Sequence, residues 1–179
     1  MKHLKYLRYV LRHKYFVAKG LWYLWLRNPR YMYLLWAMVV HDFSKFLPEE
    51  WFPYVDKFYG GKTFSYKIIP KEKRTRKDIN ESTEMVNIRF DQAWNHHQKS
   101  NKHHWQYWLL KNDKGSSKAL CMPYKFTLEM VADWYGAGMA INGCNEVVSW
   151  YDNNKDKMIL HSLTRLHVER LVYRVVSNL

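Results

Sequence analysis

The sequence has few of the residues that constrain or interrupt a chain. It contains two cysteines, Cys121 and Cys144, among 179 residues. Two cysteines are too few for a disulfide framework or a cysteine-rich zinc site, so a reducing, cytoplasmic setting is expected. Glycine and proline are also scarce, at seven and five, and long segments can therefore continue as helices.

Long hydrophobic runs are missing as well. The longest, residues 31–40, has ten residues, which is about half of what a helix needs to cross a bilayer. The basic N-terminus has no uninterrupted apolar segment and no small-residue cleavage site, so a secretory signal is not expected. The sequence therefore predicts a protein without a membrane span.

Acidic residues are absent from the start of the chain until Asp42, whereas eight Lys or Arg residues precede it. Over the whole chain, 29 Lys and Arg against 16 Asp and Glu give a net charge of +13. This balance favours an anionic partner, which can be a nucleic acid, a nucleotide or an anionic membrane. A functional basic surface and a merely solvated helix face both remain open.

Aromatic residues make up 17% of the chain, with nine Trp and fourteen Tyr. Many of them must lie in the core, because a folded domain cannot expose so many large apolar groups. Others could line a pocket that stacks a nucleobase. Composition does not separate these two uses.

Apolar residues recur at three- and four-residue steps through most of the chain, which predicts an all-α fold. The length suits a single domain, residues 1–179, formed by a bundle of five to seven helices. A basic stretch at about 60–79 has no sustained helical period and is predicted to be an exposed loop. The predicted helices cover residues 2–27, 30–46, 48–59, 80–110, 123–141 and 157–177.

Histidines and an aspartate fall on the predicted helices in positions that suit metal binding. His13 sits within the apolar stripe of the first helix, and His41 and Asp42 lie next to each other in the second. An imidazole beside a carboxylate can supply two donor atoms to one divalent cation. Lys45, one turn later, could meet a phosphate bound to that cation.

Residues 96–104 contain four of the nine histidines. On a helix, His97 and His104 would point in nearly the same direction with Asn101 between them, and the other two would lie on a neighbouring face. A buried polar row of this kind needs partners, and a metal would satisfy it. The alternatives are a surface histidine run, core histidines bonded to the backbone, or ligation by the other pair.

Glu129 and Asp133 are four residues apart on the predicted fifth helix, and Gly136 and Ala140 continue their stripe. Small residues there would either leave open space beside two carboxylates or allow close helix packing. Either way the carboxylates require cationic neighbours, because an unpaired buried charge is costly.

The order of these candidates resembles that of the HD superfamily of metal-dependent phosphohydrolases, which are helical domains named for a His-Asp doublet. His41-Asp42-Phe43-Ser44-Lys45 is also similar to the His-Asp-x-Gly-Lys form of the cyclic-dinucleotide branch, with Ser44 in place of glycine. More closely, three motifs resemble an uncharacterised family found in phages and bacteria. These motifs are HDxSK at 41–45, HHxxxxxHHW at 96–105 and the segment from Met122-Pro123 to Ala132-Asp133-Trp134.

The resemblance implies an HD-like helical bundle that holds one or two divalent ions. Mixed His and carboxylate ligation suits Mn, Fe, Co, Ni or Zn better than Mg. Lys45 would neutralise phosphoryl oxygens, Glu129 would orient the water or act as general base, and Asn101 and Lys125 would bind substrate. The implied metal ligands are His13, His41, Asp42 and Asp133 for the principal ion, and His97 and His104 for the second.

The expected activity is that of a metal-dependent phosphohydrolase, a nucleotidase or phosphodiesterase acting on a nucleotide or other phosphate ester through metal-activated water. Its partner would be a phosphorylated small molecule or a nucleic-acid end, in the cytoplasm of a bacterial cell or a phage-infected host. One alternative is a basic nucleic-acid-binding protein without catalysis. The other is a structural protein with a degenerate site, and the sequence does not decide the oligomeric state.

Overall fold

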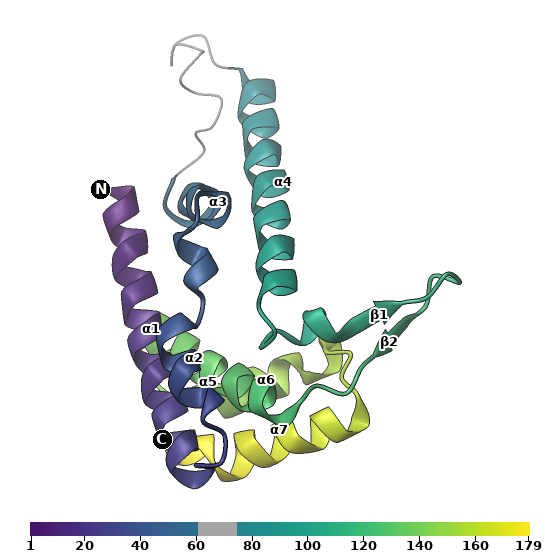
Figure 1. Cartoon of the computed structure of the whole chain (residues 1–179). Helices are drawn as coiled ribbons and strands as arrows, with labels where there is room; N and C mark the ends of the chain where they lie inside the picture. Colours follow the sequence, from purple (N-terminus) through teal and green to yellow (C-terminus); the bar gives the residue numbers. More distant parts are fainter. Residues whose placement is uncertain (61–74) are drawn as a thin grey trace. The chain divides into compact units, whose positions relative to one another are not determined.

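A computed structural model of the chain describes residues 1–60 and 75–179. Most of the predicted basic loop at about 60–79 lies outside the described residues. The described chain is helical apart from one small hairpin, so the all-α prediction is confirmed (Figure 1). None of its described helices is both long and apolar enough to cross a membrane.

The order of the elements along the chain can be followed in Figure 1. The hairpin pairs Leu109 with Ala119 in antiparallel register. The α-helices are α1 (Lys2–Arg27), α2 (Tyr33–Val40), α3 (Pro48–Tyr59), α4 (Arg76–Ser100), α5 (Tyr124–Ile141), α6 (Val147–Asn154) and α7 (Ser162–Arg174). The strands are β1 (Leu109–Lys111) and β2 (Ser117–Ala119), and the 3-10 turns are η1 (Phe43–Phe46), η4 (Trp105–Trp108), η5 (Lys155–Lys157) and η6 (Val176–Asn178).

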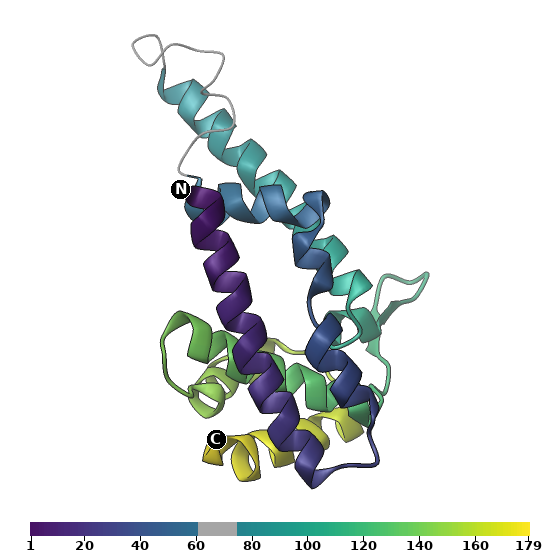
Figure 2. The same ribbon diagram turned by 60° about the vertical axis from the view of Figure 1, so that its left-hand side comes forward.

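The described chain forms two compact units, each built from two segments. The first unit contains residues 1–10 and 43–100, and the second contains residues 11–42 and 101–179. Helix α1 is continuous and contributes to both (Figure 2).

In the first unit, α3 packs against α4. Helix α3 begins with Pro48 and carries two glutamates in its first turn, which suit the position because proline fixes a helical φ and acids favour a helix N-terminus. The core of this unit gathers apolar side chains from the start of α1, from α3 and from α4. They are Tyr6, Val10, Tyr54, Val55 and Ala93.

The second unit is built around α5, whose residues 126–132 are all buried. Val17, Leu21 and Leu24 of α1 pack into the same core, together with apolar residues of α2 and α7. The predicted apolar stripe of the first helix is therefore confirmed.

The structure corrects several predicted helix boundaries. The second helix ends at Val40 rather than Phe46, and the fourth ends at Ser100 rather than Leu110. After Ser100 the chain turns, and Trp105 and Trp108 pack against the core of the second unit. Partial burial of these two tryptophans outweighs continuation of a helix through Ser100 and Asn101, residue types with modest helix propensity. Helix α6 was not predicted.

Candidate metal centre

His41 and Asp42 lie just beyond the end of α2, not within a helix as predicted. Neighbouring helical side chains diverge by about 100° and cannot face one point. His41 instead has φ −48° and ψ 127°, and Asp42 has φ 54°. This break from the helix leaves His41 Nε2 3.4 Å from Asp42 Oδ2. Aspartate is one of the few residue types that adopts a left-handed conformation at modest cost.

The end of α2 is held by Lys14 of α1. Its ammonium group donates to the carbonyl oxygens of Val39, at 3.1 Å, and His41. These carbonyls lie at the negative end of the α2 dipole, where a cation is favourable. Lys14 thus fixes the backbone from which His41 projects.

His13 and Asp133 come together because α1 and α5 pack very closely. A Cβ added to Gly136 would lie 2.4 Å from Val17 Cγ2 and 2.8 Å from Val17 N, so only glycine fits there. Of the two alternatives for the small residues of α5, close packing is therefore the one observed at Gly136. One turn away, His13 Nε2 lies 3.1 Å from Asp133 Oδ1.

Four side chains from three parts of the second unit thus converge on one point. His13 Nε2 is 3.2 Å from Asp42 Oδ2, and His41 Nε2 is 3.3 Å from Asp133 Oδ1. Donor atoms around a single ion at about 2.1 Å lie roughly 3.0–3.4 Å apart in octahedral or tetrahedral coordination. The observed spacing fits a metal ion, so this buried His/Asp cluster could hold one.

The charges of the cluster also fit a cation. Burial raises the pKa of Asp133, but contacts with His13 and His41 outweigh it and hold the pKa well below its usual value. Burial lowers the pKa of His41, yet Asp42, Asp133 and Glu129 raise it well above 6.5. The site therefore holds ionised carboxylates away from water, and a divalent ion would neutralise them with both imidazoles uncharged.

Glu129 lies behind His41 rather than among the four donors. Its Oε1 is 3.0 Å from His41 Nδ1, and its Oε2 accepts a hydrogen bond of 2.7 Å from the Tyr33 hydroxyl. Burial raises the pKa of Glu129, but contacts with His103 and His41 lower it to about 2. An ionised carboxylate on Nδ1 selects the tautomer with a proton there, which leaves Nε2 as a metal donor.

His103 belongs to the pair that the sequence leaves as an alternative to His97 and His104, and it lies at the centre of a second donor group. His103 Nε2 is 3.4 Å from Asp42 Oδ1, and His103 Nδ1 is 3.4 Å from Glu129 Oε1. Donor atoms of Asp42, His103 and His104 lie within 4.8 Å of one another. Asp42 thus presents Oδ2 to the first group and Oδ1 to the second.

The reason for pairing His97 with His104 was wrong, because α4 ends before His104 and the two do not share a helix face. His97 belongs to the first unit, where its Nδ1 lies 2.8 Å from Glu50 Oε2. Glu50 is fully buried and also lies 2.9 Å from His96 Nδ1. Burial raises the pKa of Glu50, but the bonds to His97 and His96 outweigh it, so the pKa lies below its usual value. In the sequence, the only signal for Glu50 was its place in the acidic first turn of the helix that begins at Pro48.

The remaining predicted residues lie in both units. Lys45 is buried in η1 of the first unit. The backbone carbonyl oxygen of Asn101 accepts a hydrogen bond of 3.1 Å from the backbone N–H of His104, within the turn that carries His103 and His104. The ammonium group of Lys125 lies 4.9 Å from the centre of the Tyr33 ring, one helical turn from Glu129.

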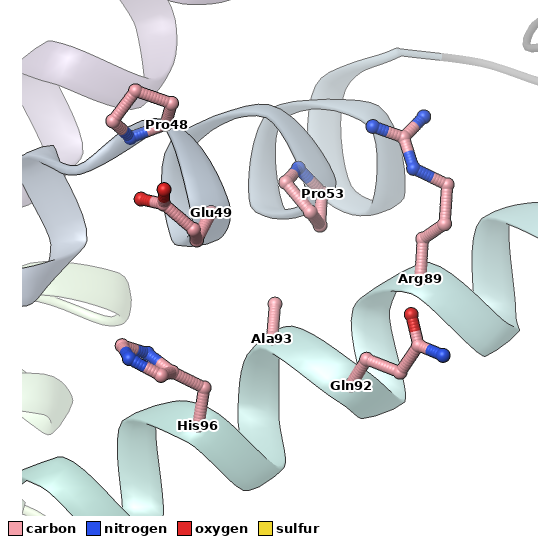
Figure 3. Close-up of a pocket in the computed structure, with 7 residues that line it drawn as sticks. All are labelled: Pro48, Glu49, Pro53, Arg89, Gln92, Ala93 and His96. Carbon is pink, nitrogen blue, oxygen red and sulfur yellow. The ribbon is translucent and has the colours of Figure 1, made fainter.

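A pocket of about 370 Å³ lies between α3 and α4 in the first unit (Figure 3). Its two charged lining groups are Glu49 and Arg89, and Arg89 also lies 3.7 Å from Asp56. The lining thus carries one charge of each sign, whereas the His/Asp cluster of the second unit combines carboxylates with imidazoles that suit a cation. The lining residues are Pro48, Glu49, Pro53, Arg89, Gln92, Ala93 and His96.

Comparison with known proteins gives a family but no activity. No curated protein and no solved structure matches the chain with significance. Residues 2–174 match a family described as a family of unknown function (DUF5662). Because the match spans nearly the whole sequence and contains both donor groups of the second unit, the chain belongs to this family.

Proposed function

We propose that this protein is a metal-dependent phosphohydrolase that cleaves a phosphate ester, with nucleotides as the leading substrate class. The observation that carries the proposal is the convergence of His13, His41, Asp42 and Asp133, whose donor atoms are spaced as around one ion. Two imidazoles with two carboxylates suit Mn, Fe, Co, Ni or Zn better than Mg.

The proposed roles follow from the positions of the side chains. A divalent ion bound by the four donors would supply an activated water and polarise the phosphoryl group. Glu129 and Tyr33 would hold His41 in the metal-binding tautomer. Asp133 retains 13% side-chain exposure, which places the accessible edge of the centre beside α5.

A second ion is supported by Asp42, His103 and His104. Asp42 would then serve both ions through its two oxygens, and His103 would join His104 as a ligand of the second ion. Ligation by His97 stays a prediction.

Lys125 supports the choice of an anionic substrate. Its ammonium group lies over the rings of Tyr33 and Phe126, 4.9 Å from each centre. Among the described residues it forms no ion pair, so its charge is available to a phosphate. Substrate binding by Asn101 and neutralisation of phosphoryl oxygens by Lys45 stay predictions.

A nucleic-acid-binding protein without catalysis is the second candidate, favoured by the net charge of +13. The two candidates differ in their dependence on the centre. Binding through basic surface groups would survive loss of Asp42, whereas hydrolysis would not.

The test combines elemental analysis with hydrolysis of nucleotides, phosphodiesters and p-nitrophenyl phosphate. We expect wild type to carry a stoichiometric transition metal after reconstitution and to release phosphate or a nucleoside monophosphate. Asp42→Asn should lose both properties, and Asp152→Asn, which changes an exposed carboxylate of α6, should keep them. Failure of reconstituted wild type to bind metal, or turnover in Asp42→Asn equal to wild type, would refute the proposal.

A further inference from the structure

Helix α1 exposes large apolar side chains on the side that faces away from the core. In the second unit these are Leu11, Tyr15, Trp22 and Leu26, with exposed fractions of 54%, 66%, 50% and 56%. They are four or seven residues apart and therefore lie along one side of the helix. We call them the apolar row, and Leu4, 61% exposed, continues it on the same helix. Large apolar side chains that are exposed along one side of a helix mark a candidate interaction surface.

A row of cations runs beside the apolar row. Arg12 and Lys19 are exposed, and Arg8 continues their line on the same helix. At 100° per residue, this basic row is rotated from the apolar row by about 50°. In the part of the chain that the structure describes, none of the three forms an ion pair. The helix contains no acidic residue at all.

Helix α2 adds to the apolar character of this region of the second unit. Met32, which precedes α2, and Trp36 and Val39 within it are 61%, 63% and 66% exposed. Lys14 donates a hydrogen bond to the Val39 carbonyl. Around helix α1, the apolar row lies between Lys14 and the basic row. The exposed apolar groups are thus bordered by cations on one side and by α2 on the other.

We propose that this face of α1 binds the surface of an anionic lipid bilayer, with the basic row on the lipid phosphates and the apolar row in the acyl boundary. Leucine, tryptophan and tyrosine beside lysine and arginine are the side chains of interfacial helices. With 26 residues, α1 extends about 39 Å.

Other partners fit the two rows less well. A nucleic acid would use the cations and the aromatic rings but gains little from Leu11 and Leu26. A second copy of the chain would bring basic rows together without carboxylates to pair them. The lipid surface satisfies both rows at once, and this inference is independent of the proposed hydrolysis.

The test is co-sedimentation of the full chain with vesicles of phosphatidylcholine, alone or mixed with phosphatidylglycerol. We expect binding to the anionic vesicles only, weakened by salt. Two variants, Leu11→Gln with Trp22→Gln and Arg12→Gln with Lys19→Gln, should each lower the partition coefficient at least tenfold. The matched control, Leu166→Gln with Lys118→Gln, changes one exposed apolar residue and one exposed cation elsewhere and should bind like wild type.

Every substituted side chain is exposed, so far-ultraviolet circular dichroism should show unchanged helix content. Asp42→Asn should bind vesicles normally, which separates this surface from the metal centre. The proposal would be overturned if wild type did not bind anionic vesicles. It would also be overturned if the variants of the apolar row and the basic row bound them as strongly as wild type. If the protein binds DNA but not vesicles, and Leu11→Gln does not change the DNA binding, the face would be assigned to nucleic acid. A dimer that Leu11→Gln dissociates, without vesicle binding, would assign it to a second copy.

Discussion

At the scale of single residues, the centre depends on Asp42, whose two oxygens face both donor groups. Asp42→Asn keeps the size and shape of the side chain, and asparagine tolerates the left-handed backbone, but the substitution removes the negative charge of the carboxylate. We expect its metal affinity to fall by more than about 100-fold, beyond the effect of losing an outer contact. Competition with a chromogenic chelator measures this, with Asp152→Asn as the control. Unchanged affinity would exclude Asp42 as a ligand.

Tyr33 affects metal binding through Glu129 and His41. Tyr33→Phe removes the hydroxyl that donates to Glu129 at 2.7 Å, so the carboxylate orients His41 less firmly. We expect a loss of metal affinity of about 10- to 100-fold and an altered visible spectrum of the cobalt-loaded protein. Tyr31→Phe, which changes a neighbouring tyrosine outside this chain of contacts, should leave both unchanged. Identical spectra in the two variants would rule out the orienting role.

Metal binding should depend on pH. Burial lowers the pKa of His41, but the surrounding carboxylates raise it well above 6.5. An imidazole must lose its proton to bind a metal, so binding releases protons and the affinity falls as the pH decreases. Calorimetric titration in two buffers of different ionisation enthalpy counts the released protons. A pH-independent affinity across neutrality would contradict this prediction.

At the scale of elements, the contact between α1 and α5 sets the distance from His13 to Asp133. Gly136→Ala would place a methyl group 2.8 Å from Val17 N, and backbone cannot give way as a flexible side chain can. We expect a loss of about 1–3 kcal/mol in the free energy of unfolding, measured by urea denaturation, together with weaker metal binding.

Gly138→Ala provides the comparison for this contact. Its added Cβ would approach Cys144 O at 3.3 Å, so we expect a smaller loss of stability and normal metal binding. Equal effects of the two substitutions would show that the close contact between Gly136 and Val17 does not account for the loss, because both substitutions raise helix propensity by the same amount.

Helix prediction was accurate where one local signal decided it. The apolar stripe gave α1, and Pro48 with two glutamates gave the start of α3. The ends of α2 and α4 were misplaced, because Lys14 and the burial of Trp105 and Trp108 act there from elsewhere in the chain. No local pattern contains such contacts.

At the scale of the whole molecule, the centre joins α1, α2 and α5 with the segment after α4, so an ion would connect distant parts of the second unit. Metal at 100 times its dissociation constant should stabilise the protein by about 2.7 kcal/mol. This corresponds to a rise in Tm of roughly 5–10 °C for a protein of this size. Thermal unfolding with metal and with chelator measures the rise, which Asp42→Asn should lack. An equal rise in that variant would point to binding elsewhere.

The sequence by itself determined the helical class and the charge, because these follow from periodicity and composition. It also indicated His13, His41, Asp42 and Asp133 as metal ligands, through the resemblance to the HD superfamily. Only the tertiary structure decided that Asp42 leaves the helix, that Glu129 supports His41 and that His103 belongs to the second donor group. These choices depend on backbone turns and on helices far apart in the chain. Periodicity describes which way a side chain faces on its own helix, but not where that helix ends or what it meets.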